Sequence, residues 1–200
     1  MIGWPYCVRV TAAEDLVPVP EDPLTRVASA VLGEDGLQVV DLLDVVDGPA
    51  PNPVDVVRAG DDLLPMLAHE NALPEALRLA RRALRPGGLL VAAVPELDRL
   101  SRLRPTAPPP KVSGHGRDRQ VTVQLWDWSP DGESYALEVV RLVRGRSTWE
   151  VANAVATRHR VLSPRQVSDE LSAAGFSSVQ RLSPAECGHP LPVWVAVAPA

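Results

Sequence analysis

Residues 73–96 read LPEALRLARRALRPGGLLVAAVPE, and this stretch decides the fold class. From Pro74 to Leu84, apolar residues recur every three or four positions, which predicts a helix of about three turns with one apolar face. We expect Pro86-Gly87-Gly88 to stop this helix in a turn. Residues 89–94 form an unbroken apolar run, typical of a strand buried on both faces. The stretch therefore predicts a helix–turn–strand unit of an α/β fold.

The chain before this unit alternates in the same way. We expect strands at residues 6–11, 37–46 and 54–59, because these runs are rich in β-branched and apolar residues. Pro23 is expected to open a helix that runs to Leu32, and the prolines at 49–53 mark a loop. Alternation of strand and helix predicts a doubly wound sheet.

The second half of the chain has a different pattern. Residues 105–119 are rich in proline, glycine and charge, which predicts a flexible loop. Two alternating runs at 120–127 and 134–143 flank an Asp131-Gly132 turn, so they predict a β-hairpin, and residues 148–162 add a third strand. A helix at 163–175 and two strands at 176–182 and 191–198 are expected to close the fold.

Composition limits the classes of protein. The chain has 200 residues, 46% of them hydrophobic, which is enough for one domain with a sizeable core. A net charge of −5 argues against binding to nucleic acid, and no long apolar run predicts a membrane segment, so we expect a cytoplasmic protein. Cys187 and His189 lie close together, but with no further ligand nearby they predict a loop and no metal site.

Several segments together resemble the class I S-adenosylmethionine (SAM) dependent methyltransferases. The run ALRLARRALRPGGLLVAAVPE resembles the helix and fifth strand of that family, and VVDLLDV and VDVVRAGDDLLPML resemble its third and fourth strands. The run SPRQVSDELSAAGFSSVQRL resembles its last helix and the strand after it. The resemblance implies a Rossmann-like doubly wound core in residues 1–98, an antiparallel β insertion at 120–162 after the fifth strand, and a closing segment at 163–200.

If the resemblance holds, SAM is the cofactor and binds at the carboxyl ends of the strands. One acid after the second strand would bind the ribose, another would face the adenine, and the turn after the fourth strand would line the methyl-donor pocket. The alternative is that these acids are solvated loop residues. The implied cofactor-binding residues are Glu14, Asp15, Asp41, Leu42, Ala59, Gly60 and Asp61.

The glycine-rich turn GxGxG of the family, which opens the first helix after the first strand, is not found in the sequence, so the sheet is expected to be incomplete at its N-terminus. Three explanations stay open: Met1 is an internal start, the protein is a degenerate relative that has lost SAM binding, or a partner subunit completes the site. A shift of register that makes residues 6–11 the first strand is less favoured, because it supplies no glycine turn either.

Two other features bear on ligands. Asp61 and Asp62 stand where the family often has an amide and a hydroxyl, and they either attract a cation or cap the following helix, of which we favour the cap. Aromatic and basic residues of the insertion are candidates for a substrate wall, although alternation puts about half of them in a packed face. These candidates are Trp126, Trp128, Tyr135, Arg141, Trp149, His159 and Arg160.

The sequence thus predicts a methyltransferase-like α/β protein that methylates a small molecule, with no identified catalytic residue. The alternative is a protein of the same fold that has no catalytic activity and serves as a binding scaffold or as an auxiliary subunit of an active partner. Both a homodimer and a heteromeric partner stay open. An unrelated α/β enzyme is not supported, because the sequence has no nucleophile elbow or phosphate-binding loop.

Overall fold

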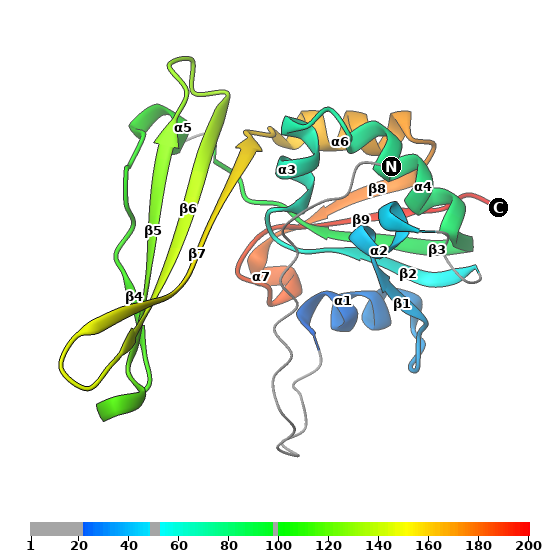
Figure 1. Ribbon diagram of the computed structural model, residues 1–200. Coiled ribbons are helices and arrows are strands. Elements are labelled where there is room, and N and C mark those ends of the chain that lie inside the picture. Colours follow the sequence, from blue (N-terminus) through cyan, green and yellow to red (C-terminus); the bar gives the residue numbers. More distant parts are fainter. Residues whose placement is uncertain (1–21, 49–52, 98–99) are drawn as a thin grey trace.

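The computed structural model describes residues 22–48, 53–97 and 100–200, which form two β-sheets with helices around the first (Figure 1). The strand expected at 6–11 and most of the loop expected at 49–53 lie outside the described residues. In chain order the elements are α1 Pro23–Leu32, β1 Val39–Asp41, α2 Leu42–Asp47, β2 Val54–Ala59, α3 Leu63–His69, α4 Leu73–Ala83, β3 Leu84–Ala93, α5 Leu100–Leu103, β4 Lys111–Ser113, the 3-10 helix η1 Gly116–Asp118, β5 Gln120–Trp128, β6 Ser134–Arg144, β7 Trp149–Arg160, α6 Pro164–Ala173, β8 Ser177–Leu182, α7 Pro184–Cys187 and β9 Val193–Val197.

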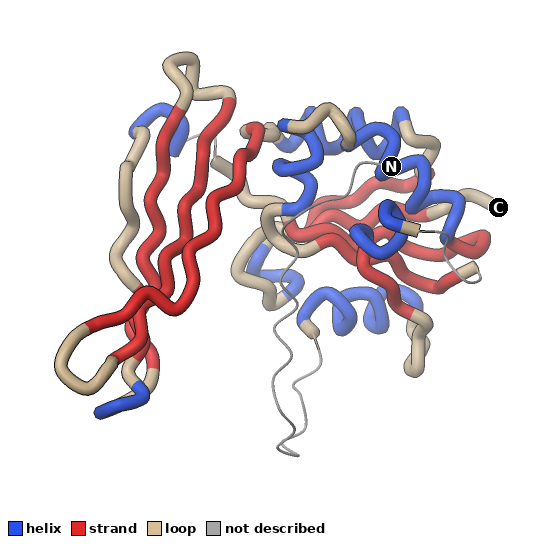
Figure 2. Tube along the Cα trace, viewed as in Figure 1, coloured by secondary structure: helices blue, strands red, loops and turns tan. Residues whose placement is uncertain are grey.

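The first sheet has five strands in the order β1-β2-β3-β9-β8. Strands β1, β2 and β3 are parallel, whereas β9 is antiparallel to both of its neighbours. Helices α2, α3, α4 and α6 cover one face and α1 covers the other, so the sheet lies between two helical layers (Figure 2). The predicted doubly wound α/β core is therefore confirmed.

The strand predicted at 37–46 is wrong beyond Asp41. Residues from Leu42 to Asp47 form the helix α2 instead, and Leu42 and Val45 are both buried. These two residues are three positions apart, which places them on one side of a helical turn that packs on the core. A short apolar run such as this one fits a strand and a helix equally well in sequence.

The deciding stretch forms a helix and a strand as predicted, but the turn between them differs. Helix α4 buries Leu77 and Ala80 completely, and β3 begins at Leu84 directly after the helix. Pro86-Gly87-Gly88 therefore lies inside the strand, at a bulge between β2 and β3. The Gly87 N–H donates to the carbonyl of Ala198, and Gly88 approaches the carbonyl of Asp55. The two glycines allow this irregular start of a buried strand.

Close approach at Gly88 makes a testable prediction. A Cβ at this position would lie 2.9 Å from the Asp55 carbonyl oxygen and 3.0 Å from that of Arg85, both of which are fixed in the backbone. We expect Gly88→Ala to lower the free energy of unfolding by about 2 kcal/mol, measured by urea denaturation. Gly48→Ala is the control, because its Cβ would meet nothing within 4 Å, and it should change stability by less than about 0.5 kcal/mol. Equal effects of the two substitutions would contradict the close approach.

The second sheet is antiparallel, with the order β4-β5-β6-β7, and confirms the predicted hairpin and third strand. It begins at Lys111, inside the segment predicted as a loop at 105–119, because β4 pairs with β5. The sheet extends away from the α/β body on one side, and we call it the arm (Figure 1). Helix α3 packs beside β7 where the arm meets the body.

The end of the chain folds as expected. Helix α6 begins with a capping box between Ser163 and Gln166, and β8 and β9 complete the first sheet. The short helix α7 lies within the predicted connection at 183–190. None of the helices in the described part of the chain has the length and apolar character needed to cross a lipid bilayer.

Candidate active site

The candidate site lies at the carboxyl ends of β1, β2 and β3, the edge at which open α/β sheets bind ligands. Strand β1 ends at Asp41, and β2 is followed by Gly60, Asp61 and Asp62. Because parallel strands end at the same edge of a sheet, these acids gather there. Ala59 is fully buried, whereas the three residues that follow it are exposed.

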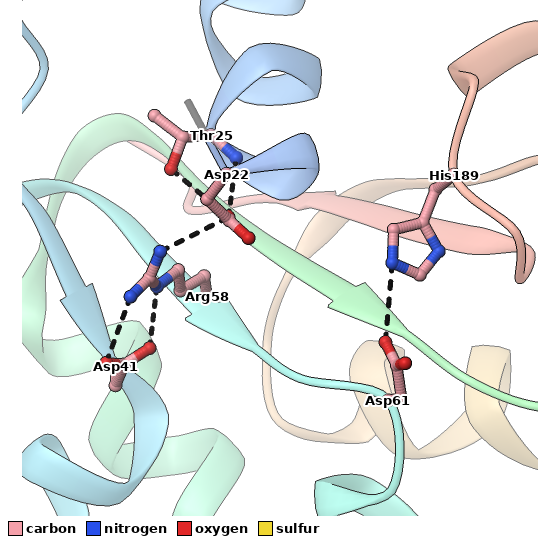
Figure 3. Close-up of polar contacts among 6 residues, drawn as sticks. All are labelled: Asp22, Thr25, Asp41, Arg58, Asp61 and His189. Atoms are coloured by element: carbon pink, nitrogen blue, oxygen red, sulfur yellow. Dashed lines mark hydrogen bonds and ion pairs between the residues drawn. The ribbon is translucent and has the colours of Figure 1, made fainter. Parts of the chain in front are cut away.

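Arg58 of β2 joins Asp41 to Asp22, the residue that precedes α1 (Figure 3). The guanidinium of Arg58 donates from Nε to Asp41 Oδ1 at 2.6 Å and from Nη2 to Asp41 Oδ2 at 3.2 Å. A third nitrogen, Nη1, lies 3.2 Å from Asp22 Oδ2, and the Asp22 carboxylate also caps α1 by accepting from Thr25. The bond to Asp41 is the main reason that the pKa of Arg58 is raised. Both oxygens of Asp41 thus accept from Arg58, while Leu42 beside it is fully buried in the core.

Asp61 pairs with a histidine from the other end of the chain. His189 Nε2 lies 3.3 Å from Asp61 Oδ1 (Figure 3), and His189 is only 7% exposed. The N–H of Leu191 donates to His189 Nδ1 at 3.0 Å. The same nitrogen also lies 3.2 Å from the Leu191 carbonyl oxygen, so the main chain of Leu191 fixes the ring while Nε2 points to Asp61. The loop after α7 therefore orients a carboxylate at the end of β2.

Asp62 stands at the N-cap position of α3, but its side chain makes no capping hydrogen bond. The prediction that this pair of acids caps the helix by its side chains is therefore wrong for Asp62. Desolvation by the surrounding protein raises the pKa of Asp62, and the negative charge of Asp61 raises it further. His69 is the last residue of this helix.

A row of aromatic rings from the arm lies close to Asp62. Tyr135 stacks on His159, with ring centroids 4.9 Å apart, and on Trp126, with centroids 5.1 Å apart. Tyr135 and His159 are buried, and the His159 Nε2 lies 2.7 Å from the Thr157 hydroxyl. Burial, together with the negative charge of Asp62, raises the pKa of Tyr135 above its usual range. We call this stack of apolar rings the wall, and the Asp62 that follows β2 acts on the pKa values of Tyr135 and His159 within it.

His159 is a neutral member of this wall. Desolvation lowers its pKa from 6.5 to about 4, and the positive charge of His69 acts in the same direction, although the main chain of Asp62 opposes the shift. Two ring nitrogens of the wall, His159 Nδ1 and Trp126 Nε1, are buried without a hydrogen-bond partner among the described residues. The Trp128 indole, in contrast, donates to the Pro105 carbonyl at 2.8 Å. Beside the wall, a cleft of about 420 Å³ is lined by residues that include His69, Trp128, Tyr135 and Arg158.

The structure brings together only some of the predicted site residues. Asp41, Ala59, Gly60 and Asp61 lie at one edge of the sheet, and Trp126, Trp128, Tyr135 and His159 lie in the wall. The other three substrate candidates lie elsewhere: Arg160 lines a separate small cavity beside α6, and Arg141 and Trp149 lie toward the far end of the arm. Glu14 and Asp15 are outside the described residues.

Sequence reasoning missed Arg58 and His189. Arg58 is the single cation of β2, and the neighbouring strand β1 ends in an acid, which is a signal for pairing across the sheet. His189 gave no signal beyond its closeness to Cys187, whose thiol instead donates to the Ser183 carbonyl at 3.1 Å. Its partner Asp61 is far away in sequence, so only the fold reveals the pair.

Comparisons with known proteins show which solved structures have a similar fold. No protein-family profile matches the sequence, and no curated protein matches it. Three similar solved structures each have a TM-score of 0.60. A SAM-dependent methyltransferase from Clostridium acetobutylicum is 8% identical over 78% of this chain and 63% of its own. An amino pentose methyltransferase from Micromonospora echinaspora is 15% identical over 78% and 62%, and a sugar N-methyltransferase from Streptoalloteichus is 14% identical over 99% and 100%.

The chain therefore has the fold of class I SAM-dependent methyltransferases, with a Rossmann-like sheet and a second antiparallel sheet. It spans less than two thirds of the length of the first two of these structures.

The buried neutral histidine makes a prediction about pH. Because the pKa of His159 is about 4 in the folded chain and 6.5 without the fold, the unfolded state binds more protons between these values. Above pH 6.5 this histidine does not lower the free energy of unfolding. As the pH falls from 6.5 toward 4, the free energy of unfolding decreases by about 3 kcal/mol in all. His159→Gln removes the titrating ring, so its free energy of unfolding, although lower at pH 7, should fall less on acidification. Urea denaturation at pH 7 and near pH 4 measures the difference.

The control for this experiment is His115→Gln, because His115 is exposed. It should lose as much stability on acidification as the wild type. A His159→Gln variant with the same pH dependence as the wild type would show that His159 is not buried in its neutral form.

Proposed function

We propose that this chain is the α/β part of a SAM-dependent methyltransferase that acts on a small molecule. The observation that carries the proposal is the set of carboxylates at the carboxyl ends of β1 and β2, on a fold shared with SAM-dependent methyltransferases. The three solved structures compared above are described as methyltransferases, two of them for sugars.

The residues at the sheet edge fit such a cofactor. SAM carries ribose hydroxyls, an adenine amino group and a positively charged sulfonium, all of which carboxylates can bind by hydrogen bonds or by charge. Asp41 would accept from the adenine amino group, since a carboxylate held by one arginine still has acceptor sites left. Asp61 and Asp62 would face the cationic part of the cofactor, and Glu14 or Asp15 would bind the ribose.

Methyl transfer places few chemical demands on the protein. When bound, SAM supplies an activated methyl group, which an in-line nucleophile on the acceptor takes as the bond to sulfur breaks. The chain then has to align the acceptor and exclude water, and positioning of this kind contributes most of the rate. The wall of Trp126, Tyr135 and His159 would hold the acceptor near Asp62, and the Asp62 carboxylate, whose pKa is raised, would take a proton from it.

The second candidate function is a scaffold of the same fold without catalysis. It is favoured by the two side-chain pairs at the sheet edge, because Arg58 already holds Asp41 and His189 already holds Asp61. These pairs would keep the acids in place in a protein that binds no cofactor.

Calorimetric titration of the full chain with SAM and with S-adenosylhomocysteine distinguishes the two functions. Micromolar binding supports the enzyme, and the heat of binding then serves as an assay for variants. If neither compound binds to the folded chain, the chain by itself is not a methyltransferase and the scaffold is favoured.

Substitution of Asp61 tests the site directly. We expect Asp61→Asn to weaken SAM binding about tenfold, because it removes the charge that faces the sulfonium. Asp169→Asn is the matched control, since Asp169 is an exposed residue of α6 away from the sheet edge. SAM binding that is unchanged in Asp61→Asn would place the cofactor away from the end of β2.

A further inference from the structure

The connection between β8 and β9 lies at the same edge of the sheet as the acids that follow β1 and β2. Strand β9 is antiparallel to β3, and Val193 at its start pairs with Ala93 at the end of β3. The residues that precede β9 therefore lie beside the carboxyl end of β3. His189 belongs to this connection, and its imidazole points toward Asp61 (Figure 3).

The main chain around His189 holds its ring in one place. The N–H of Leu191 donates to Nδ1 at 3.0 Å, and the ring is only 7% exposed. The N–H of Val94 donates to the carbonyl of Pro192 at 3.1 Å, which ties the end of the connection to the end of β3. The remaining ring nitrogen, Nε2, lies 3.3 Å from Asp61 Oδ1, so a fixed group meets this carboxylate.

The two members of this pair differ in exposure. The side chain of His189 is 8% exposed, whereas that of Asp61 is 54% exposed. Among the residues that the structure describes, the Asp61 carboxylate makes no other hydrogen bond or ion pair. A carboxylate has several acceptor sites on its two oxygens, so a contact at Oδ1 leaves Oδ2 for a ligand.

We propose that His189 is a positioning residue that fixes the direction of the Asp61 carboxylate and thereby sets how strongly the site distinguishes SAM from S-adenosylhomocysteine. This inference rests on the proposed function, in which Asp61 faces the cationic part of SAM. The two compounds differ in charge at sulfur, because SAM is a sulfonium and S-adenosylhomocysteine is a neutral thioether. A carboxylate held toward this sulfur attracts the first compound and has no charge to attract in the second.

A fixed direction matters because Asp61 is more than half exposed. The attraction between two charges near water is weak and falls with distance, so a carboxylate that turns toward the solvent contributes little to binding. A side chain that is already held in the binding orientation loses less conformational freedom when the ligand arrives. His189 therefore acts on the cofactor through Asp61 and does not itself touch the reacting atoms.

Substitutions that keep one half of the imidazole test this role. His189→Asn keeps a polar group near the position of Nδ1, where the Leu191 main chain binds, but it is too short to reach Asp61. His189→Gln keeps an N–H group near the position of Nε2. Calorimetric titration of the full chain gives the dissociation constants of SAM and S-adenosylhomocysteine. We expect His189→Asn to weaken SAM binding about fivefold relative to S-adenosylhomocysteine, and His189→Gln to change this ratio by less than about twofold.

Two controls separate positioning from a general role in folding. Cys187→Ser alters the same connection, but the Cys187 thiol donates to the Ser183 carbonyl and does not contact Asp61, so the ratio should not change. In the Asp61→Asn background, His189→Asn should have no further effect on the ratio, because it acts through that carboxylate. A loosened connection would instead weaken the binding of both compounds alike.

The outcomes distinguish this inference from the function on which it rests. Circular dichroism shows whether His189→Asn is folded, and His189→Leu, which has a similar volume, replaces it if it is not. A wild-type chain that binds both compounds, with a ratio that the His189 variant leaves unchanged, would overturn this inference alone. A wild-type chain that binds neither compound would overturn the proposed function together with it.

Discussion

Burial of β2 and β3 between two helical layers is the interaction on which the rest of the structure depends. Alternate residues of each strand enter opposite cores: Val56 and Val91 pack on the side of α1, whereas Val57 and Ala92 pack on the side of α4. Burial of apolar side chains on both faces stabilises the parallel pairing of these strands. A tight turn cannot join parallel strands, so their pairing depends on this burial. Once these strands are parallel and adjacent, the polar residues that follow them must appear at one edge.

The carboxylates at that edge are held by residues that are distant in the sequence. Arg58 ties the end of β1 to the start of α1, and His189 ties the end of β2 to the loop before β9. Asp62 has no such capping or pairing role in α3, and its raised pKa follows from the protein and the carboxylate around it. The two neighbouring acids thus differ: Asp61 is paired with His189, whereas Asp62 has a raised pKa, and differences of this kind are common at functional sites.

The arm contributes a stack of aromatic rings near its junction with the α/β body. Its aromatic rings pack with Leu97 and Leu137, and Asp62 acts on the pKa values of both Tyr135 and His159.

The sequence by itself determined the elements with a clear period: α4 and its apolar face, the buried runs of β2 and β3, the hairpin of β5 and β6 around Asp131-Gly132, and the order of helices and strands that makes an α/β sheet. It also placed Asp61 just after the strand predicted at 54–59. The spacing of apolar residues along a segment is a local property, so it identifies a helix or a strand wherever the segment is long enough. Residues 42–47 were too short for this, and the two glycines at 87 and 88 fit a turn as well as a bulge. Only the tertiary structure decided that Arg58 holds Asp41, that His189 holds Asp61, and that Tyr135 stacks between Trp126 and His159. Each of these depends on the distance between residues far apart in the chain, and that distance is set by the packing of the whole fold.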